Sequence, residues 1–172
     1  GLDLIAGVFE EEPAVGLPPN VIVDLAAQTA APLARWVKDS DLVSLMAEMG
    51  VTVNFWHVAD AGKDSVDLLD RLVATYGAGP NYIVVKNLGR GSDFSQLDES
   101  AALKKASALG GQVVSLPALH EASMRKIDRQ NASFWAAIHR KDGEDALGML
   151  ERQRVKTWLK ASYAVLETLP LG

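Results

Sequence analysis

Apolar residues gather in four short runs that predict β-strands. The runs are Val21–Leu25, Val51–Val58, Tyr82–Lys86 and Gln112–Leu116. Each is rich in β-branched residues and is bounded by Gly, Pro, Asn or Asp, as strands usually are. The second run alternates between apolar and polar residues more than the others, which favours a position nearer the edge of a sheet.

The segments between and after these runs have apolar residues three and four positions apart, the period of an amphipathic helix. They predict helices over residues 32–49 with an interruption at 38–41, 64–77, 95–110, 119–127, 132–139 and 144–166. Strands that alternate with helices are typical of a parallel sheet, and right-handed crossovers place helices on both of its faces. We therefore predict one α/β domain over residues 1–172, a three-layer α/β/α fold with a helical C-terminus.

Composition narrows the class of protein. The 172 residues are 48% hydrophobic and 23% charged, which is typical of a soluble globular domain. The net charge of -5 disfavours strong intrinsic binding to nucleic acid. The chain has no cysteine, so disulfides and thiolate metal sites are excluded. With no secretory signal and no apolar run long enough to cross a bilayer, we expect a cytoplasmic protein that does not span a membrane.

Polar or glycine-rich loops follow each predicted strand. In open parallel sheets, ligands bind beyond the carboxyl ends of the strands, so these loops are the expected location of a site. The loops are Asp24–Gln28, His57–Asp64, Asn87–Asp93 and Pro117–His120.

Three residues in these loops have a functional and a structural interpretation. Asp24 ends an apolar run, where a carboxylate needs a partner such as a magnesium-bound water, or caps the next helix. Asn87 offers a donor and an acceptor to a ring edge, or is a turn residue. Arg90 stands between two glycines and suits an anion, or is simply solvated.

Two phosphate-binding patterns are absent from the sequence. Gly62-Lys63 resembles the end of a phosphate-binding loop, but that motif requires a glycine at position 57, where His57 stands, and Ser or Thr at position 64, where Asp64 stands. A dinucleotide fingerprint would need a third glycine at position 94, which is Phe94.

The last predicted helix has a basic side. Its cations stand among apolar residues that are expected to pack inward, so the basic side is either solvated or a docking surface for DNA or an acidic partner. The cations are Arg152, Arg154, Lys156 and Lys160.

The segment Val21–Gln28 resembles the Walker B and switch II segment of the ParA/MinD/CobQ-type P-loop ATPases. The stretches Leu45–Val58, Gly62–Leu69, Tyr82–Asn87 and Gln153–Lys156 are similar in order to the divergent plasmid mobilisation (TraL-like) branch. The resemblance covers about residues 19–166, and it implies the C-terminal part of a nucleotide-binding fold.

The resemblance implies a role for several residues. Asp24 would organise Mg²⁺, Gln28 would respond to the γ-phosphate, Asn87 would contact adenine, and Pro117 would border the base pocket. ATP and Mg²⁺ are the implied cofactors. A nucleotide-bridged homodimer and a DNA-processing or partition protein are the implied partners.

The family's Gly-rich loop precedes the Walker B strand, and nothing in this sequence matches it. We therefore expect an ATP-binding protein of plasmid partition, mobilisation or conjugation that is incomplete for hydrolysis unless such a loop lies upstream. One alternative is a non-catalytic partner-binding module of the same fold. Another is a Rossmann-like enzyme that uses His57, Asp60 and His120 on a small metabolite.

Overall fold

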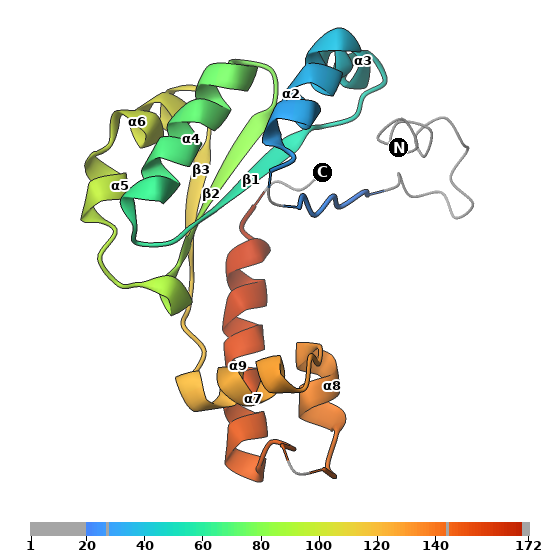
Figure 1. The fold of residues 1–172 in the computed structure, drawn as a ribbon, viewed down its shortest axis with the longest axis vertical. Coiled ribbons are helices and arrows are strands. Elements are labelled where there is room, and N and C mark those ends of the chain that lie inside the picture. Colours follow the sequence, from blue (N-terminus) through green and yellow to red (C-terminus); the bar gives the residue numbers. More distant parts are fainter. Residues whose placement is uncertain (1–19, 27, 144, 170–172) are drawn as a thin grey trace. The chain divides into compact units, whose positions relative to one another are not determined.

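The structure is a computed structural model that describes residues 20–26, 28–143 and 145–169. The chain divides into two compact units, Gly1–Val51 and Thr52–Gly172, which are described separately below. Figure 1 shows the elements of both units. The single-domain organisation stays a prediction.

The described part of the first unit contains two helices, α2 (Ala30–Asp39) and α3 (Leu42–Glu48). The interruption predicted within this helical segment is confirmed. Asp41 separates the helices in a left-handed conformation with φ of 44°, and its carboxylate accepts a hydrogen bond of 2.9 Å from the Ser44 hydroxyl. A β-branched residue would not adopt that conformation readily, whereas Asp tolerates it.

The predicted strand at Val21–Leu25 is wrong. Residues 20–26 form no strand, and the side chain of Ile22 is 95% exposed. A run of β-branched residues favours an extended backbone, but it becomes a strand only when a neighbouring strand pairs with it. The described sheet supplies no such neighbour to this run.

The second unit contains a parallel sheet of three strands in the order β1-β2-β3 (Figure 1). The strands are β1 (Asn54–Ala59), β2 (Asn81–Asn87) and β3 (Gln112–Leu116). All three were predicted, and the parallel arrangement is confirmed. Within the described residues, β1 lies at one edge of the sheet, as predicted, and β3 lies at the other.

The helices between the strands follow the predicted order. They are α4 (Lys63–Tyr76), the short 3₁₀ helix η1 (Leu88–Arg90), α5 (Ser95–Glu99) and α6 (Ala101–Ala108). The helix predicted over residues 95–110 is broken at Ser100. Its hydroxyl accepts a hydrogen bond of 3.0 Å from the Leu103 N–H and donates one of 2.7 Å to the Leu97 carbonyl, so it caps α6 where α5 ends.

Alternate residues of β2 bury against different layers. Tyr82 and Val84 join the apolar cluster formed with α4 and α6, in which Leu69 is fully buried. Ile83 and Val85 face the other way and pack with Leu166, at the end of the last helix, and with Leu169. The α/β class is therefore confirmed, with apolar cover on both faces of the central strand.

The chain after β3 is helical, as predicted. It forms α7 (Glu121–Arg129), α8 (Phe134–His139) and α9 (Met149–Leu166), which share a second apolar cluster. The cluster consists of Ile127, Ala137, Ile138, Leu147 and Val155. Among the described residues, no helix has both the length and the apolar character needed to cross a membrane.

Candidate functional site

The loop between β1 and α4 is held by Asp60 and Ser65. The Asp60 carboxylate accepts hydrogen bonds of 2.7 Å from the Ser65 hydroxyl and 2.8 Å from the Gly62 N–H. The Ser65 hydroxyl oxygen in turn accepts a hydrogen bond of 3.0 Å from the Asp60 N–H. The Ser65 hydroxyl, the Gly62 N–H and the nearby positive charge of Arg90 lower the pKa of Asp60. An ionised Asp60 therefore fixes the start of α4.

His57 also bonds to Ser65 at the start of α4. Its Nε2 lies 2.8 Å from the Ser65 carbonyl oxygen, so Nε2 carries the proton and donates. Burial lowers the pKa of His57, against smaller opposing effects of this hydrogen bond and of Asp60. A neutral His57 that supports a helix start is a structural residue.

The histidine-based enzyme hypothesis gains no support from these contacts. Both His57 and Asp60 are bound to Ser65, and neither forms a hydrogen bond or an ion pair with His120, the residue before α7. Their use on a small metabolite stays a prediction.

The loops that follow β1 and β2 touch each other at Gly91 and Ala61. A Cβ atom added to Gly91 would lie 2.4 Å from the Cβ of Ala61, and Gly91 has a φ of 141°. Only glycine fits such an approach and such a backbone conformation. The contact brings the exposed Arg90 of the second loop toward Asp60 of the first, which is why the charge of Arg90 acts on that carboxylate.

Asn87 and Pro117 lie at the same end of the sheet. Asn87 pairs in register with Leu116 of β3, so Pro117 begins just beyond the neighbouring strand. The Asn87 side-chain oxygen accepts a hydrogen bond of 3.0 Å from the Gly89 N–H, which supports its interpretation as a turn residue. The Pro117 carbonyl accepts a hydrogen bond of 2.6 Å from the indole N–H of Trp158 in α9.

The structure thus brings together three of the predicted site residues, Asn87, Arg90 and Pro117, at the carboxyl end of the sheet. Asp24 and Gln28 belong to the first unit and are exposed there. Gln28 adopts a left-handed conformation with φ of 72°. The roles of Asp24 with Mg²⁺ and of Gln28 with a γ-phosphate stay predictions.

Two residues of this region were not identified as functional or structural centres from the sequence. For Ser65 a signal exists, because an Asp followed two residues later by Gly favours a turn stabilised by the Asp side chain. For Trp158 there is none. A part-buried indole N–H requires an acceptor, but the sequence does not reveal that the acceptor is 41 positions away.

The groups at this end of the sheet suit an anion better than a protein-held metal ion. Arg90 provides a cation, and the N-terminus of α4 adds the positive end of a helix dipole. The nearest carboxylate, Asp60, is already bound to a hydroxyl and an amide. In the described ranges, no group of three or more His, Cys, Asp or Glu residues could hold a metal. Arg90 and the start of α4 are thus the groups here that suit an anion, and the use of ATP and Mg²⁺ stays a prediction.

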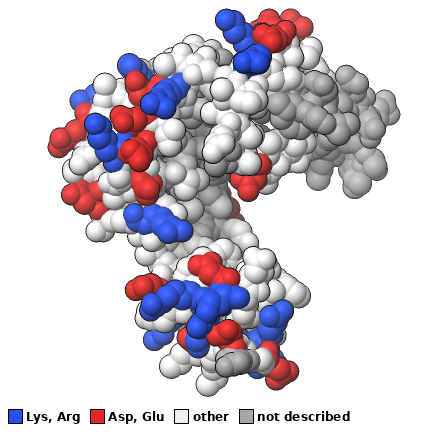
Figure 2. Space-filling model, in the orientation of Figure 1, with Lys and Arg blue, Asp and Glu red and all other residues white. Residues whose placement is uncertain are grey.

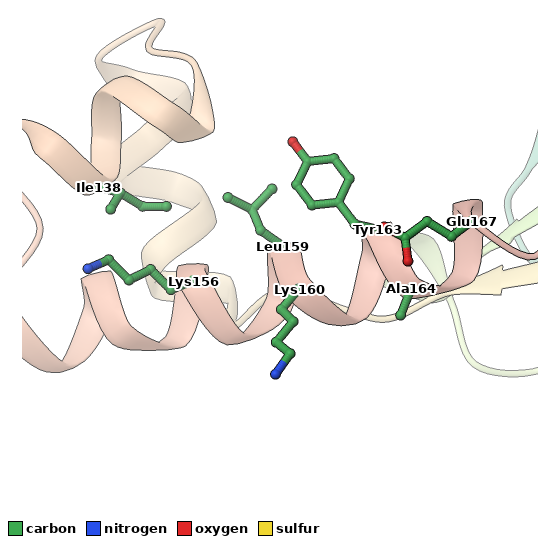
Figure 3. A pocket seen from close by; sticks show the side chains of 7 residues that line it. All are labelled: Ile138, Lys156, Leu159, Lys160, Tyr163, Ala164 and Glu167. Atoms are coloured by element: carbon green, nitrogen blue, oxygen red, sulfur yellow. The ribbon is translucent and has the colours of Figure 1, made fainter.

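A separate groove lies between α8 and α9 (Figure 3). Leu159 and Tyr163 project from α9 on the side where Ile138 of α8 lies, and Lys156 and Lys160 extend from the same helix. Ala164 and Glu167 complete the lining. Within the described chain, neither lysine forms an ion pair. Figure 2 shows lysine and arginine side chains gathered over the C-terminal helices, with carboxylates among them. Of the predicted basic side of α9, Arg154, Lys156 and Lys160 are exposed, whereas Arg152 is half-buried and donates a hydrogen bond to the Leu147 carbonyl. Its use for docking stays a prediction.

Comparisons of the chain with protein-family models, with curated proteins and with solved structures find no match. The site must therefore be interpreted from its own geometry.

Proposed function

We propose that this chain binds an anionic nucleotide at the carboxyl end of its parallel sheet. The close approach of Gly91 to Ala61 is the observation that carries the proposal, because it unites the loops after β1 and β2. The united loops place the Arg90 guanidinium near the start of α4, where a helix N-terminus favours negative charge. Asn87 and Pro117 border the same end of the sheet and would flank the base.

The resemblance to ParA/MinD-type ATPases supports ATP as the nucleotide and plasmid partition, mobilisation or conjugation as the setting. A second nucleotide-bound copy and a DNA-processing or partition protein are the partners that it suggests. No phosphate-binding loop occurs in the 172 residues. The proposed activity of this stretch is therefore binding, with hydrolysis conditional on a Gly-rich loop elsewhere in the protein.

Titration with a fluorescent ATP analogue, with and without Mg²⁺, tests the proposal. We expect saturable binding by the unaltered chain and about tenfold weaker binding by Arg90→Ala, because a charge-assisted hydrogen bond contributes roughly 1.5–3 kcal/mol. Lys104→Ala is the matched control, since Lys104 is an exposed cation on α6, away from these loops, and its loss should leave the affinity unchanged.

A second variant tests the loop contact itself. Gly91→Val forces the two loops apart, because its side chain would overlap Ala61, and it should weaken binding as much as Arg90→Ala does. No binding by the unaltered chain, or equal affinity in the Arg90 and Lys104 variants, would contradict the proposal. Thermal unfolding of every variant shows whether the fold is retained.

One observation favours a second candidate, a partner-binding module that needs no nucleotide. Lys156 and Lys160 extend beside the apolar groove between α8 and α9 without an ion pair to any described residue. This candidate predicts that ATP causes no thermal shift, whereas the nucleotide proposal predicts a clear one.

A further inference from the structure

Lys86 is a shielded cation at the carboxyl end of the central strand. It is the residue before Asn87 in β2, and its side chain is 17% exposed. Its Nζ lies 2.5 Å from a carboxylate oxygen of Asp98 in α5 and 5.9 Å from the centroid of the Phe94 ring. Ligands of open parallel sheets bind beyond this end of the strands, so a cation here is placed to meet an anionic ligand.

The side chain of Lys86 lies on the face of the sheet that α4 covers. Alternate residues of a strand share a face, and Val84 belongs to the same apolar cluster as Leu69 of α4. In register, Lys86 pairs with Ala59, the last residue of β1, after which Asp60 leads into the loop before α4. Lys86 therefore lies in the same layer as the start of α4, where an anion is proposed to bind.

The two partners of the Lys86–Asp98 ion pair differ in exposure. The side chain of Asp98 is 48% exposed, against 17% for Lys86. A half-exposed carboxylate can leave the pair for water at little cost, whereas a shielded ammonium then needs another anion in its place. Among the described residues, Asp98 is the one anionic partner of Lys86, whose ammonium has three N–H donors. The pair is therefore suited to exchange its carboxylate for a phosphate.

We propose that Lys86 is a second phosphate-binding cation of the nucleotide site, and that the phosphate displaces Asp98 from it. The inference rests on the proposed nucleotide function and assigns the phosphates to two cations. Arg90 approaches from the loop after β2, and Lys86 from the end of the strand itself. Asp98 thus competes with the ligand, because it neutralises Lys86 when no nucleotide is bound and turns to solvent when a phosphate takes its place.

Titration with the fluorescent ATP analogue distinguishes this role from a purely structural ion pair. If Asp98 competes with phosphate, Asp98→Asn should bind the analogue about threefold more tightly or better, because Lys86 no longer has to exchange a charged partner. If the pair only fastens α5 to the strand, Asp98→Asn should bind no more tightly. Glu99→Gln is the matched control, since it removes the same charge from an exposed neighbour in α5, and it should leave the affinity unchanged.

A double-mutant cycle shows whether the gain in affinity depends on Lys86. Lys86→Met alone should weaken binding about tenfold, and adding Asp98→Asn to it should restore none of the loss. An equal gain from Asp98→Asn in both backgrounds would overturn the proposal, because it would be a general effect of net charge. Thermal unfolding shows whether Lys86→Met folds, and Lys86→Gln replaces it if it does not. If neither variant folds, equal affinities of Asp98→Asn and Glu99→Gln would overturn the proposal.

Ligands that share only part of ATP separate this inference from the proposed function. Competition by tripolyphosphate should respond to Asp98→Asn and Lys86→Met as ATP binding does, whereas competition by adenosine should respond to neither. An equal response of adenosine would overturn the role of Lys86 in binding phosphate. No binding by the unaltered chain would contradict the proposed function and this inference together. Binding that depends on Arg90 but is not tightened by Asp98→Asn would overturn this inference alone.

Discussion

The sheet region, residues 52–116, and the helical region, residues 117–169, are stabilised in different ways. The larger apolar cluster of the sheet region has ten buried residues between the strands and α4 to α6, and a smaller one on the other face joins Ile83 and Val85 to Leu169. The cluster shared by α7, α8 and α9 has five. Because stability scales with apolar area removed from water, the smaller cluster leaves the helical region more dependent on other contacts.

Those other contacts are polar links between helices. Lys126 of α7 lies 2.8 Å from a carboxylate oxygen of Glu151 in α9, and Arg129 lies 2.9 Å from Asp145 in the preceding loop. Gln130 donates a further hydrogen bond to the Asp145 carbonyl. The Lys126–Glu151 pair is the less exposed of these two ion pairs and links α7 to α9 beside a small core. The sheet region has an ion pair too, between Lys86 and Asp98, but it combines that pair with a larger apolar core.

The largest expected effect lies in the core of the sheet region. Leu69→Ala removes a fully buried side chain of α4 and should cost about 2–5 kcal/mol of unfolding free energy through lost burial and a cavity. Leu68→Ala is the matched control, because Leu68 is 54% exposed, and it should cost within about 0.5 kcal/mol. Urea denaturation measures both, and equal losses would contradict the description of this core.

A smaller effect is expected from the corresponding change in the helical region. Leu147→Ala opens the cluster shared by α7 to α9 and should cost about 2–3 kcal/mol, because a small, open cluster can collapse around the lost volume. Hydrogen exchange should rise in α7 to α9 more than in β1 to β3. Leu150→Ala, at an exposed position, should change little. An equal rise of hydrogen exchange in both regions would contradict the view that the two regions are stabilised separately.

The smallest effect distinguishes two ion pairs of equal length. Lys126→Met should cost about 1 kcal/mol and Lys105→Met less than about 0.5 kcal/mol. Both pairs have N–O distances of 2.8 Å, but side-chain exposures are 31% and 19% for Lys126 and Glu151, against 57% and 50% for Lys105 and Asp70. Denaturation at neutral pH measures the difference. Equal costs would show that the helical pair is no more stabilising than a surface pair.

The same pair predicts a pH dependence. The Lys126 hydrogen bond, followed by the Gly148 N–H, lowers the pKa of Glu151 from its ordinary value of 4.5. A carboxyl with a lowered folded pKa stabilises the fold above its ordinary pKa, and that contribution is lost as the pH falls through the folded value. Acid titration of stability below pH 4.5 should therefore be shallower in Lys126→Met than in the unaltered chain.

Much of the fold was predictable, and the failures have specific causes. The strand at Gln112–Leu116 was predicted with its observed bounds, because its apolar run ends sharply at glycines and a proline. The break between α2 and α3 was visible as a polar run at 38–41. Val21–Leu25 had the composition of a strand but has no partner in the described sheet.

The sequence predicted only part of the candidate site. Parallel topology predicted that loops after successive strands meet at one end, and it correctly grouped Asn87 with Pro117. The pattern could not decide whether the Asn87 side-chain oxygen binds a ligand or, as the structure has it, accepts a hydrogen bond from the Gly89 N–H. The hydrogen bond from the Ser65 hydroxyl to the Asp60 carboxylate was not predicted. A hydroxyl in the first turn of a helix has several local acceptors, and the sequence does not choose among them.

The order of residues by itself determined the succession of strands and helical segments in the second unit and that its strands run parallel, but not the break between α5 and α6 at Ser100. Those properties depend on neighbours within a turn of helix or a short crossover, so a local pattern is sufficient to specify them. The tertiary structure alone decided that Gly91 meets Ala61, that Trp158 binds Pro117, and that β2 is the central strand of the described sheet. Each of these depends on which distant surfaces pack together, and many different arrangements satisfy the same periodic pattern.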